Sequence, residues 1–178
     1  MSQGNRGMAF EMLLNLNNQL YATKKIALIN KRPTPVKVLK SKGTKVLNGF
    51  YESKSTVDYD GVYQGRAIAF EAKSVGIDRF DLKNLHQHQI DYLEKVESMG
   101  GVAFVLIEFR QSRQVYFVPF STIQHYVYHA AHGGRKSIPK EDFDVYAYEV
   151  PNDRVPLDFL SVVDLILGCS DEKRISVR

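Results

Sequence analysis

The fold is decided by residues 55–73, which read STVDYDGVYQGRAIAFEAK. Two runs in this stretch, 57–63 and 66–73, are rich in Val, Ile, Phe and Tyr and alternate along the chain, which is typical of β-strands. Gln64-Gly65 between them fits the two-residue turn of a β-hairpin. Asp60-Gly61 is an equally good turn pair, and a turn there would change the register of the two strands.

Two carboxylates face each other if the turn lies at Gln64-Gly65. Asp58 is then directly opposite Glu71, with the two Cβ atoms about 4.5–5.5 Å apart. Carboxylates this close repel each other, and a cation between them removes the repulsion. Because both side chains supply hard oxygen ligands, the pair predicts a site for Mg²⁺ or Mn²⁺ rather than for Zn²⁺.

A lysine joins this pair. The two-residue period of a strand places Lys73 on the same face as Glu71. An Asp followed by Glu-x-Lys is the arrangement of metal-dependent nucleases, in which the metal polarises the scissile phosphate and lowers the pKa of the attacking water. The lysine ammonium can position that water or stabilise charge on the phosphate oxygens. The alternative is a half-exposed sheet with its acids in solvent, because so short a motif also arises by chance.

The charge distribution favours a polyanionic partner. The formal net charge is only +4, but residues 12–51 contain eight Lys and Arg and no acid. Such a segment favours nucleic acid over a solvated basic surface. A membrane-binding helix is disfavoured because Pro33 and Pro35 would break it. The residues expected to contact DNA phosphates are Lys31, Arg32, Lys37, Lys40, Lys42 and Lys45.

The remaining periodicity predicts an α/β fold. Helices are expected over 6–22, 85–98 (capped by Asn84), 121–131 and 158–167, and strands over 26–29, 45–51, 102–109 and 115–120. This order predicts a mixed β-sheet flanked by helices. The 178 residues suit a single nuclease domain over 1–168, with a basic segment over about 33–56 and a polar C-terminal tail over 169–178.

Composition narrows the protein class further. A lone Cys169 cannot form an internal disulfide, so a secreted disulfide scaffold is excluded. No apolar run approaches the roughly 20 residues of a membrane span, and the N-terminus lacks the features of a signal peptide. We therefore expect a cytoplasmic protein without membrane contact.

Six motifs, taken together, resemble the RecU family of Holliday-junction resolvases, which occurs in low-GC Gram-positive bacteria and some of their phages. They are NRGM at 5–8 with Glu11, NKRPTP at 30–35, STVDYDGVY at 55–63, FEAK at 70–73, LKNLHQHQI at 82–90 and GGRKSI at 133–138. The motifs stand in the family's order, and the resemblance extends from about residue 5 to 168.

The resemblance implies a restriction-endonuclease-like fold and a homodimer. Such a dimer cuts four-way DNA junctions by paired nicks on symmetry-related strands, with Mg²⁺ or Mn²⁺, and its basic segment forms a stalk that enters the junction's centre. Lys73 would stabilise the transition state. The metal ligands that the resemblance implies are Thr56, Asp58, Glu71 and Gln89. The helical period alone also predicts that Gln89 points inward, because it shares a helix face with Leu85 and Leu93.

The sequence departs from the family at several points, of which two bear on the site and the stalk. Val57 stands where Thr is usual, and the stalk segment is a few residues short, which would fit a phage-encoded member. Two alternatives therefore stay open: a nuclease that cuts other branched or nicked DNA, and a junction-binding protein that recruits recombination partners without cutting. Glu11 either approaches the metal from the first helix or is a solvated residue beside Arg6. No residue supports a recombinase contact in particular.

Overall fold

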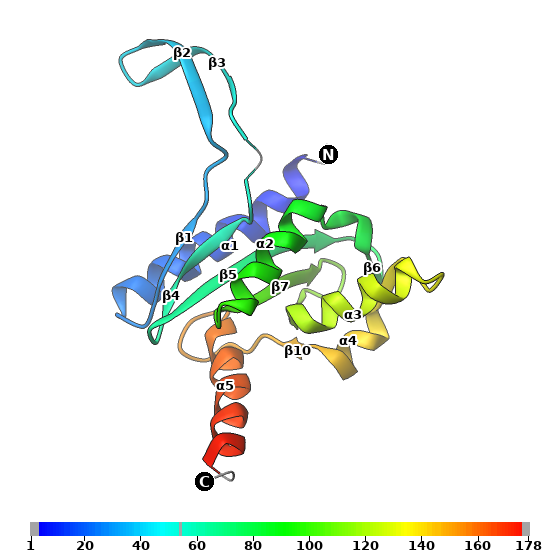
Figure 1. Cartoon of the computed structure of the whole chain (residues 1–178). Coiled ribbons are helices and arrows are strands. Elements are labelled where there is room, and N and C mark those ends of the chain that lie inside the picture. Colours follow the sequence, from blue (N-terminus) through cyan, green and yellow to red (C-terminus); the bar gives the residue numbers. More distant parts are fainter. Residues whose placement is uncertain (1–3, 54, 176–178) are drawn as a thin grey trace.

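Figure 1 shows the computed structural model, which describes residues 4–53 and 55–175, with side chains at 7–53 and 55–168. The helices are α1 (Gly4–Thr23), the 3₁₀ turn η1 (Leu82–Asn84), α2 (Gln87–Ser98), α3 (Phe120–Ala131), α4 (Lys140–Tyr146) and α5 (Phe159–Ile175). The strands are β1 (Leu28–Lys31), β2 (Val36–Lys42), β3 (Lys45–Tyr51), β4 (Tyr59–Tyr63), β5 (Arg66–Val75), β6 (Arg79–Asp81), β7 (Val102–Phe109), β8 (Gln114–Pro119), β9 (Ser137–Pro139) and β10 (Tyr148–Glu149).

A six-stranded mixed sheet forms the centre of the protein. Its strand order is β1-β4-β5-β7-β8-β10, and only the central pair β5–β7 is parallel, joined by the crossover helix α2. β7 is buried on both faces, as its continuous apolar sequence predicts. The predicted α/β fold with a mixed sheet flanked by helices is confirmed.

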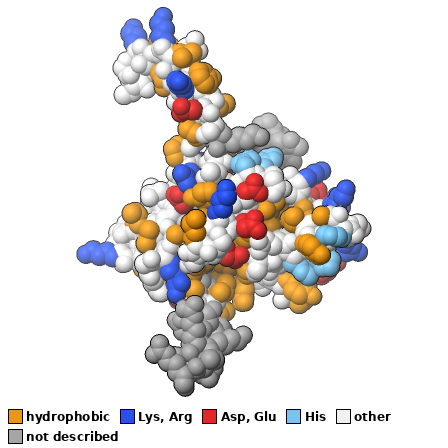
Figure 2. Space-filling view, viewed as in Figure 1, with side chains coloured by type: hydrophobic (Ala, Val, Ile, Leu, Met, Phe, Trp, Pro, Cys, Tyr) orange, Lys and Arg blue, Asp and Glu red, His pale blue; other side chains and the backbone are white. Residues whose placement is uncertain are grey.

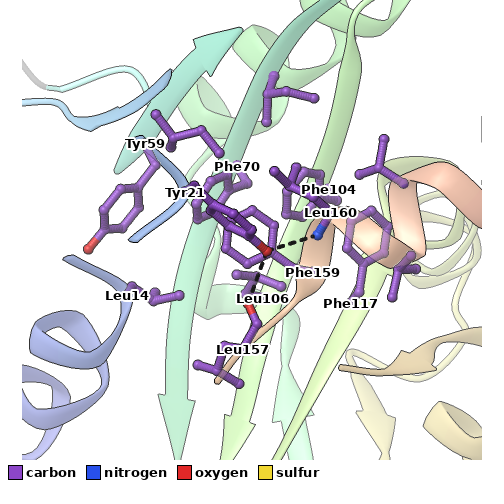
Figure 3. Close-up of a cluster of buried hydrophobic side chains, with 14 of the residues drawn as sticks. Leu14, Tyr21, Tyr59, Phe70, Phe104, Leu106, Phe117, Leu157, Phe159 and Leu160 are labelled. Atoms are coloured by element: carbon purple, nitrogen blue, oxygen red, sulfur yellow. Dashed lines mark hydrogen bonds between the residues drawn. The ribbon is translucent and has the colours of Figure 1, made fainter. Parts of the chain in front are cut away.

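Two hydrophobic clusters cover the two faces of this sheet. Helices α1 and α5 pack on one face, where Tyr21, Phe70, Phe104 and Phe159 form an aromatic group (Figure 3). Helices α2 and α3 pack on the other face. Alternate residues of β5 therefore point to different layers, with Phe70 toward α1 and α5 and Ala69 toward α2 and α3.

The hairpin turn lies at Gln64-Gly65, as predicted. Both residues have a positive φ, of 49° and 74°, which is the geometry of a type I′ turn. The alternative turn at Asp60-Gly61 is wrong, because Gly61 lies inside β4 opposite Ile29. A Cβ atom on Gly61 would lie 2.0 Å from the Leu28 carbonyl oxygen, so close strand approach explains this glycine.

A second hairpin, β2–β3, projects from the body of the molecule (Figure 1). Its strands pair only with each other, and every residue in them is exposed. Lysine side chains gather at its far end (Figure 2). Strand β3 was predicted at its observed bounds, whereas β2 was not predicted, because its sequence VKVLKSK lacks a clear alternation.

Several element boundaries differ from the prediction. Helix α2 is capped by His86 rather than by Asn84, which ends the 3₁₀ turn η1 instead. β1 lies two residues later than expected, and the short elements β6, β9, α4 and β10 were not predicted. Helix α5 continues to Ile175, past the expected boundary at residue 168, because residues 171–174 (DEKR) include strong helix formers. None of the described helices has the length and apolarity to cross a membrane.

Candidate active site

Asp58 and Glu71 lie side by side, Asp58 directly before the start of β4 and Glu71 in the middle of β5. The register Tyr59↔Phe70 brings Asp58 opposite Glu71. The Asp58 backbone N–H donates to Glu71 Oε2 over 3.2 Å, and Asp58 Oδ2 accepts from the Ala72 backbone N–H over 3.1 Å. The turn at Gln64-Gly65 is therefore what creates this carboxylate pair.

Glu71 is fully buried, with 0% of its surface exposed. Lys73 Nζ donates to Glu71 Oε1 over 3.1 Å, and Gln89 Nε2 donates to the same oxygen. Burial, together with the smaller effect of the Asp58 charge, raises the pKa of Glu71 to about 8, although the Lys73 ammonium opposes both effects. The fold thus holds the Glu71 carboxylate where its ionisation is costly unless a cation binds in addition to Lys73.

The donor set around this pair fits a hard divalent cation. Thr56 Oγ1 is buried and has no hydrogen-bond partner within the described residues. A buried hydroxyl without a partner is costly unless something binds it. The described residues contain no cluster of three or more His, Cys, Asp and Glu that could hold a metal. The candidate ligands are instead two carboxylates and a neutral hydroxyl oxygen, which suit Mg²⁺ or Mn²⁺.

Gln89 reaches the site through its amide nitrogen. Its Oε1 accepts from the His86 backbone N–H over 2.9 Å, which completes the cap of α2, while its Nε2 holds Glu71. In this arrangement Gln89 orients Glu71 and links it to the start of α2. Ligation of a metal by the Gln89 oxygen would require the amide to leave the His86 N–H.

A pocket of about 190 Å³ lies beside Asp58, on the side of α1. It is lined by Gly7, Met8, Phe10, Glu11, Lys31, Asp58, Tyr59, Ala72 and Ser74. Glu11 therefore lines the same pocket as Asp58, and its approach to a metal stays a prediction. Its carboxylate forms an ion pair with Lys31, and both side chains are nearly half exposed. The Arg6 side chain lies outside the described ones.

The predicted DNA-contacting residues fall into two groups. Lys31 pairs with Glu11, and Arg32 Nη1 donates to Asp60 over 2.8 Å and to the Tyr92 hydroxyl over 3.0 Å. The Arg32 backbone N–H also donates to the Asp58 carbonyl over 2.8 Å. Lys31 and Arg32 therefore stabilise the foot of the β2–β3 hairpin, where the chain leaves β1. The cations exposed on the hairpin, without an ion pair in the described part of the chain, are Lys37, Lys40, Lys42 and Lys45.

Two residues that help to build the candidate active site were not predicted from the sequence. Tyr92 lies one helical turn after Gln89 and touches Arg32, and this three-residue spacing on α2 could have indicated it. Ser74 lines the pocket and is held by Glu108 and Arg110, its neighbours across β7 and the following turn. No local sequence signal indicates this second contact, because it depends on the parallel register of β5 and β7.

Glu71→Gln is expected to stabilise the metal-free protein. Because the folded-state pKa of Glu71 is raised from 4.5 to about 8, the folded chain binds this proton more tightly than the unfolded chain does. Its contribution is fully present below pH 4.5 and is lost as the pH rises through about 8. At higher pH we expect the variant to be more stable than the wild type by about 2–5 kcal/mol, or roughly 4–20 °C in Tm.

Thermal unfolding in EDTA across the pH range measures this effect. The control is the same pair of proteins in saturating Mg²⁺, which should raise the Tm of the wild type and leave that of Glu71→Gln unchanged. Equal Tm values for the two metal-free proteins at every pH would contradict the burial argument.

Comparisons with known proteins identify the family of the chain. The family model "Recombination protein U" matches residues 5–165. The chain is 38% identical to the Holliday junction resolvase RecU of Bacillus pumilus over 178 residues, covering 96% of this chain and 85% of the relative. It is 36% identical to that of Geobacillus sp. strain WCH70 (92% and 85% covered) and 35% identical to that of Bacillus subtilis strain 168 (92% and 82% covered).

Among solved structures, the Holliday junction resolvase Hjc of Archaeoglobus fulgidus matches with a TM-score of 0.45 and 14% identity, covering 82% of this chain and 93% of Hjc. The family match spans nearly the whole chain and includes Asp58, Glu71, Lys73 and the β2–β3 hairpin. The chain belongs to the RecU family.

Proposed function

We propose that this protein is a metal-dependent endonuclease that resolves four-way DNA junctions in recombination and repair, by paired symmetric nicks. The observation that carries the proposal is the buried Glu71 beside Asp58, with Lys73 on the same face, close to the foot of a basic hairpin. The relatives' name, Holliday junction resolvase, supports the same reaction. A DNA substrate and a lone cysteine also suit a cytoplasmic location.

Thr56, Asp58 and Glu71 would hold a Mg²⁺ ion, for which Mn²⁺ is the natural substitute. When bound, such an ion polarises the scissile phosphate and lowers the pKa of a water. Gln89 keeps the Glu71 carboxylate in place, either from its present position or as a fourth ligand after its amide turns. The Ala72 backbone N–H fixes Asp58 in the same way.

Lys73 supplies a positive charge at the reacting phosphate. Its side chain is 22% exposed, so its ammonium is partly desolvated and still reachable from solvent. Its contact with Glu71 Oε1 orients the ammonium beside the metal-binding carboxylates. From there it can stabilise negative charge that develops on the phosphate oxygens during attack.

The β2–β3 hairpin is the proposed junction-binding stalk. Four lysines on a projecting hairpin can contact phosphates of more than one arm without reading bases. Residues 1–168 would act as one nuclease domain with this stalk at about 33–56, and two copies would present two active sites to the two strands cut. Cleavage of flap and four-way substrates at equal rates would favour the alternative of a general branched-DNA nuclease.

Neutralising the hairpin lysines should flatten the salt dependence of junction binding. In the variant Lys37→Gln/Lys40→Gln/Lys42→Gln/Lys45→Gln, we expect the slope of log K against log salt concentration to fall by about 3 to 4 per bound chain, or about 7 for two copies on one junction, because each phosphate contact contributes about 0.9. Fluorescence anisotropy of a labelled junction in EDTA measures this slope.

The matched control removes the same number of charges from exposed lysines of the body, with Gln at positions Lys25, Lys83, Lys95 and Lys136. This control should change the slope by less than about 1. Equal slopes for the wild type and the hairpin variant would show that the hairpin makes no phosphate contacts.

A further inference from the structure

Helix α2 is linked to both of the candidate metal-binding carboxylates. Gln89, in its first turn, donates from Nε2 to Glu71 Oε1. Tyr92, three residues later and on the same side of the helix, accepts from Arg32 Nη1 over 3.0 Å. Arg32 in turn donates its backbone N–H to the Asp58 carbonyl over 2.8 Å. One helix therefore contacts Glu71 directly and reaches Asp58 through Arg32.

The Arg32 side chain is held by two partners. Its Nη1 donates to Asp60 Oδ2 over 2.8 Å as well as to the Tyr92 hydroxyl, and its guanidinium lies 5.7 Å from the centre of the Tyr92 ring, which attracts a cation. The pair with Asp60 is more than a third exposed on both sides, so solvent weakens it. Tyr92 packs against the buried cluster under α2 and α3 and is thus the firmer anchor.

The strand register explains why the position of Arg32 matters for Asp58. Lys31 ends β1 and pairs with Tyr59, so Arg32 falls opposite Asp58, one step beyond the paired strands. The backbone bond from Arg32 to Asp58 is the last of this ladder, because the next residue, Pro33, has no N–H to donate. Any shift of Arg32 therefore moves the main chain that carries the Asp58 carboxylate.

We propose that Tyr92 is a positioning residue for the metal site. Through Arg32 it fixes the main chain of Asp58, as Gln89 fixes the Glu71 carboxylate, so that α2 sets the separation of the two carboxylates. Mg²⁺ demands near-ideal octahedral geometry, so a small displacement of one ligand weakens its binding. The inference rests on the proposed function, because it assigns Tyr92 to the metal site of that nuclease.

Tyr92→Phe tests this proposal, because it removes the acceptor for Arg32 and keeps the ring. The affinity for Mn²⁺ alone, measured by electron paramagnetic resonance without DNA, should fall roughly tenfold, since a hydrogen bond to a charged group is lost. The single-turnover rate of junction cleavage at subsaturating Mn²⁺ should fall by a similar factor. Junction affinity in EDTA should stay within about twofold, because Tyr92 acts on the metal site and not on DNA.

Tyr126→Phe is the matched control. Tyr126 is also a partly buried tyrosine that packs against the cluster under α2 and α3, and its hydroxyl donates to Asp142 Oδ2 over 2.7 Å. This hydrogen bond also involves a charged side chain, but it joins α3 to α4 and touches neither carboxylate of the metal site. We expect the Mn²⁺ affinity and the cleavage rate of Tyr126→Phe to equal those of the wild type.

A double-mutant cycle separates positioning through Arg32 from general support of α2. In an Arg32→Met background, Tyr92→Phe should weaken Mn²⁺ binding by less than about twofold more, because its route to Asp58 is already cut. The full tenfold loss in that background, or an unchanged Mn²⁺ affinity of Tyr92→Phe alone, would overturn the positioning role and leave the nuclease proposal intact. A wild type that neither binds Mn²⁺ nor cuts a junction would overturn the proposed function itself.

Discussion

Asp58→Asn should lower the rate of junction cleavage in Mg²⁺ by roughly a thousandfold or more. Asparagine keeps an oxygen that can accept from the Ala72 backbone N–H, so the local structure should be preserved. What it removes is one of the two negative charges that would hold the metal. The remaining carboxylate, Glu71, is buried and reluctant to ionise, so it cannot replace the missing charge.

Asp60→Asn is the matched control for this prediction. Asp60 lies two residues further along the same chain segment, but its carboxylate pairs with Arg32 instead of with the Glu71 group. We expect its cleavage rate to stay within about tenfold of the wild type. Single-turnover cleavage of a labelled junction measures both variants. Equal losses of cleavage rate in Asp58→Asn and Asp60→Asn would mean that Asp58 acts only by supporting the β4–β5 hairpin.

Lys73→Met has the second largest expected effect. The single-turnover rate at saturating protein should fall roughly 10²–10³-fold, because the ammonium is expected to act on charge that develops only in the transition state. Methionine fills similar space, and the hydrogen bond from Gln89 still holds Glu71. Junction affinity in EDTA should therefore change less than about threefold.

Lys83→Met controls for the loss of one positive charge near α2. Lys83 is exposed and lies 3.9 Å from Asp81, away from the carboxylate pair. The single-turnover cleavage rate of Lys83→Met should match that of the wild type. A Lys73→Met protein that binds the junction much more weakly but cuts bound junction at the normal rate would assign Lys73 to binding alone.

The catalytic hairpin could be predicted from sequence because its information is local. The turn at Gln64-Gly65 sets the register, and the register places Asp58 opposite Glu71. The central strand β7 and helix α3 were also predicted to within a residue or two, since each has a strong periodicity of its own. In these elements local preference and tertiary structure agree.

Features that depend on contacts between distant segments could not be predicted. The contacts of Arg32 with Asp60 and Tyr92 are an example, because these two residues lie on a neighbouring strand and on α2; its role as a DNA contact stays a prediction. The sequence places Gln89 on the inner face of its helix but cannot show that its amide oxygen is used to cap that helix.

The most direct test of the account is cleavage of a labelled four-way junction beside a linear duplex of the same sequence, in Mg²⁺, Mn²⁺ and EDTA, for wild type and Asp58→Asn. We expect paired nicks at symmetry-related positions of the junction with either metal, an intact linear duplex, and no cutting in EDTA or by the variant. Tight junction binding by the wild type without cutting under any metal would contradict the nuclease assignment and favour a junction-binding protein.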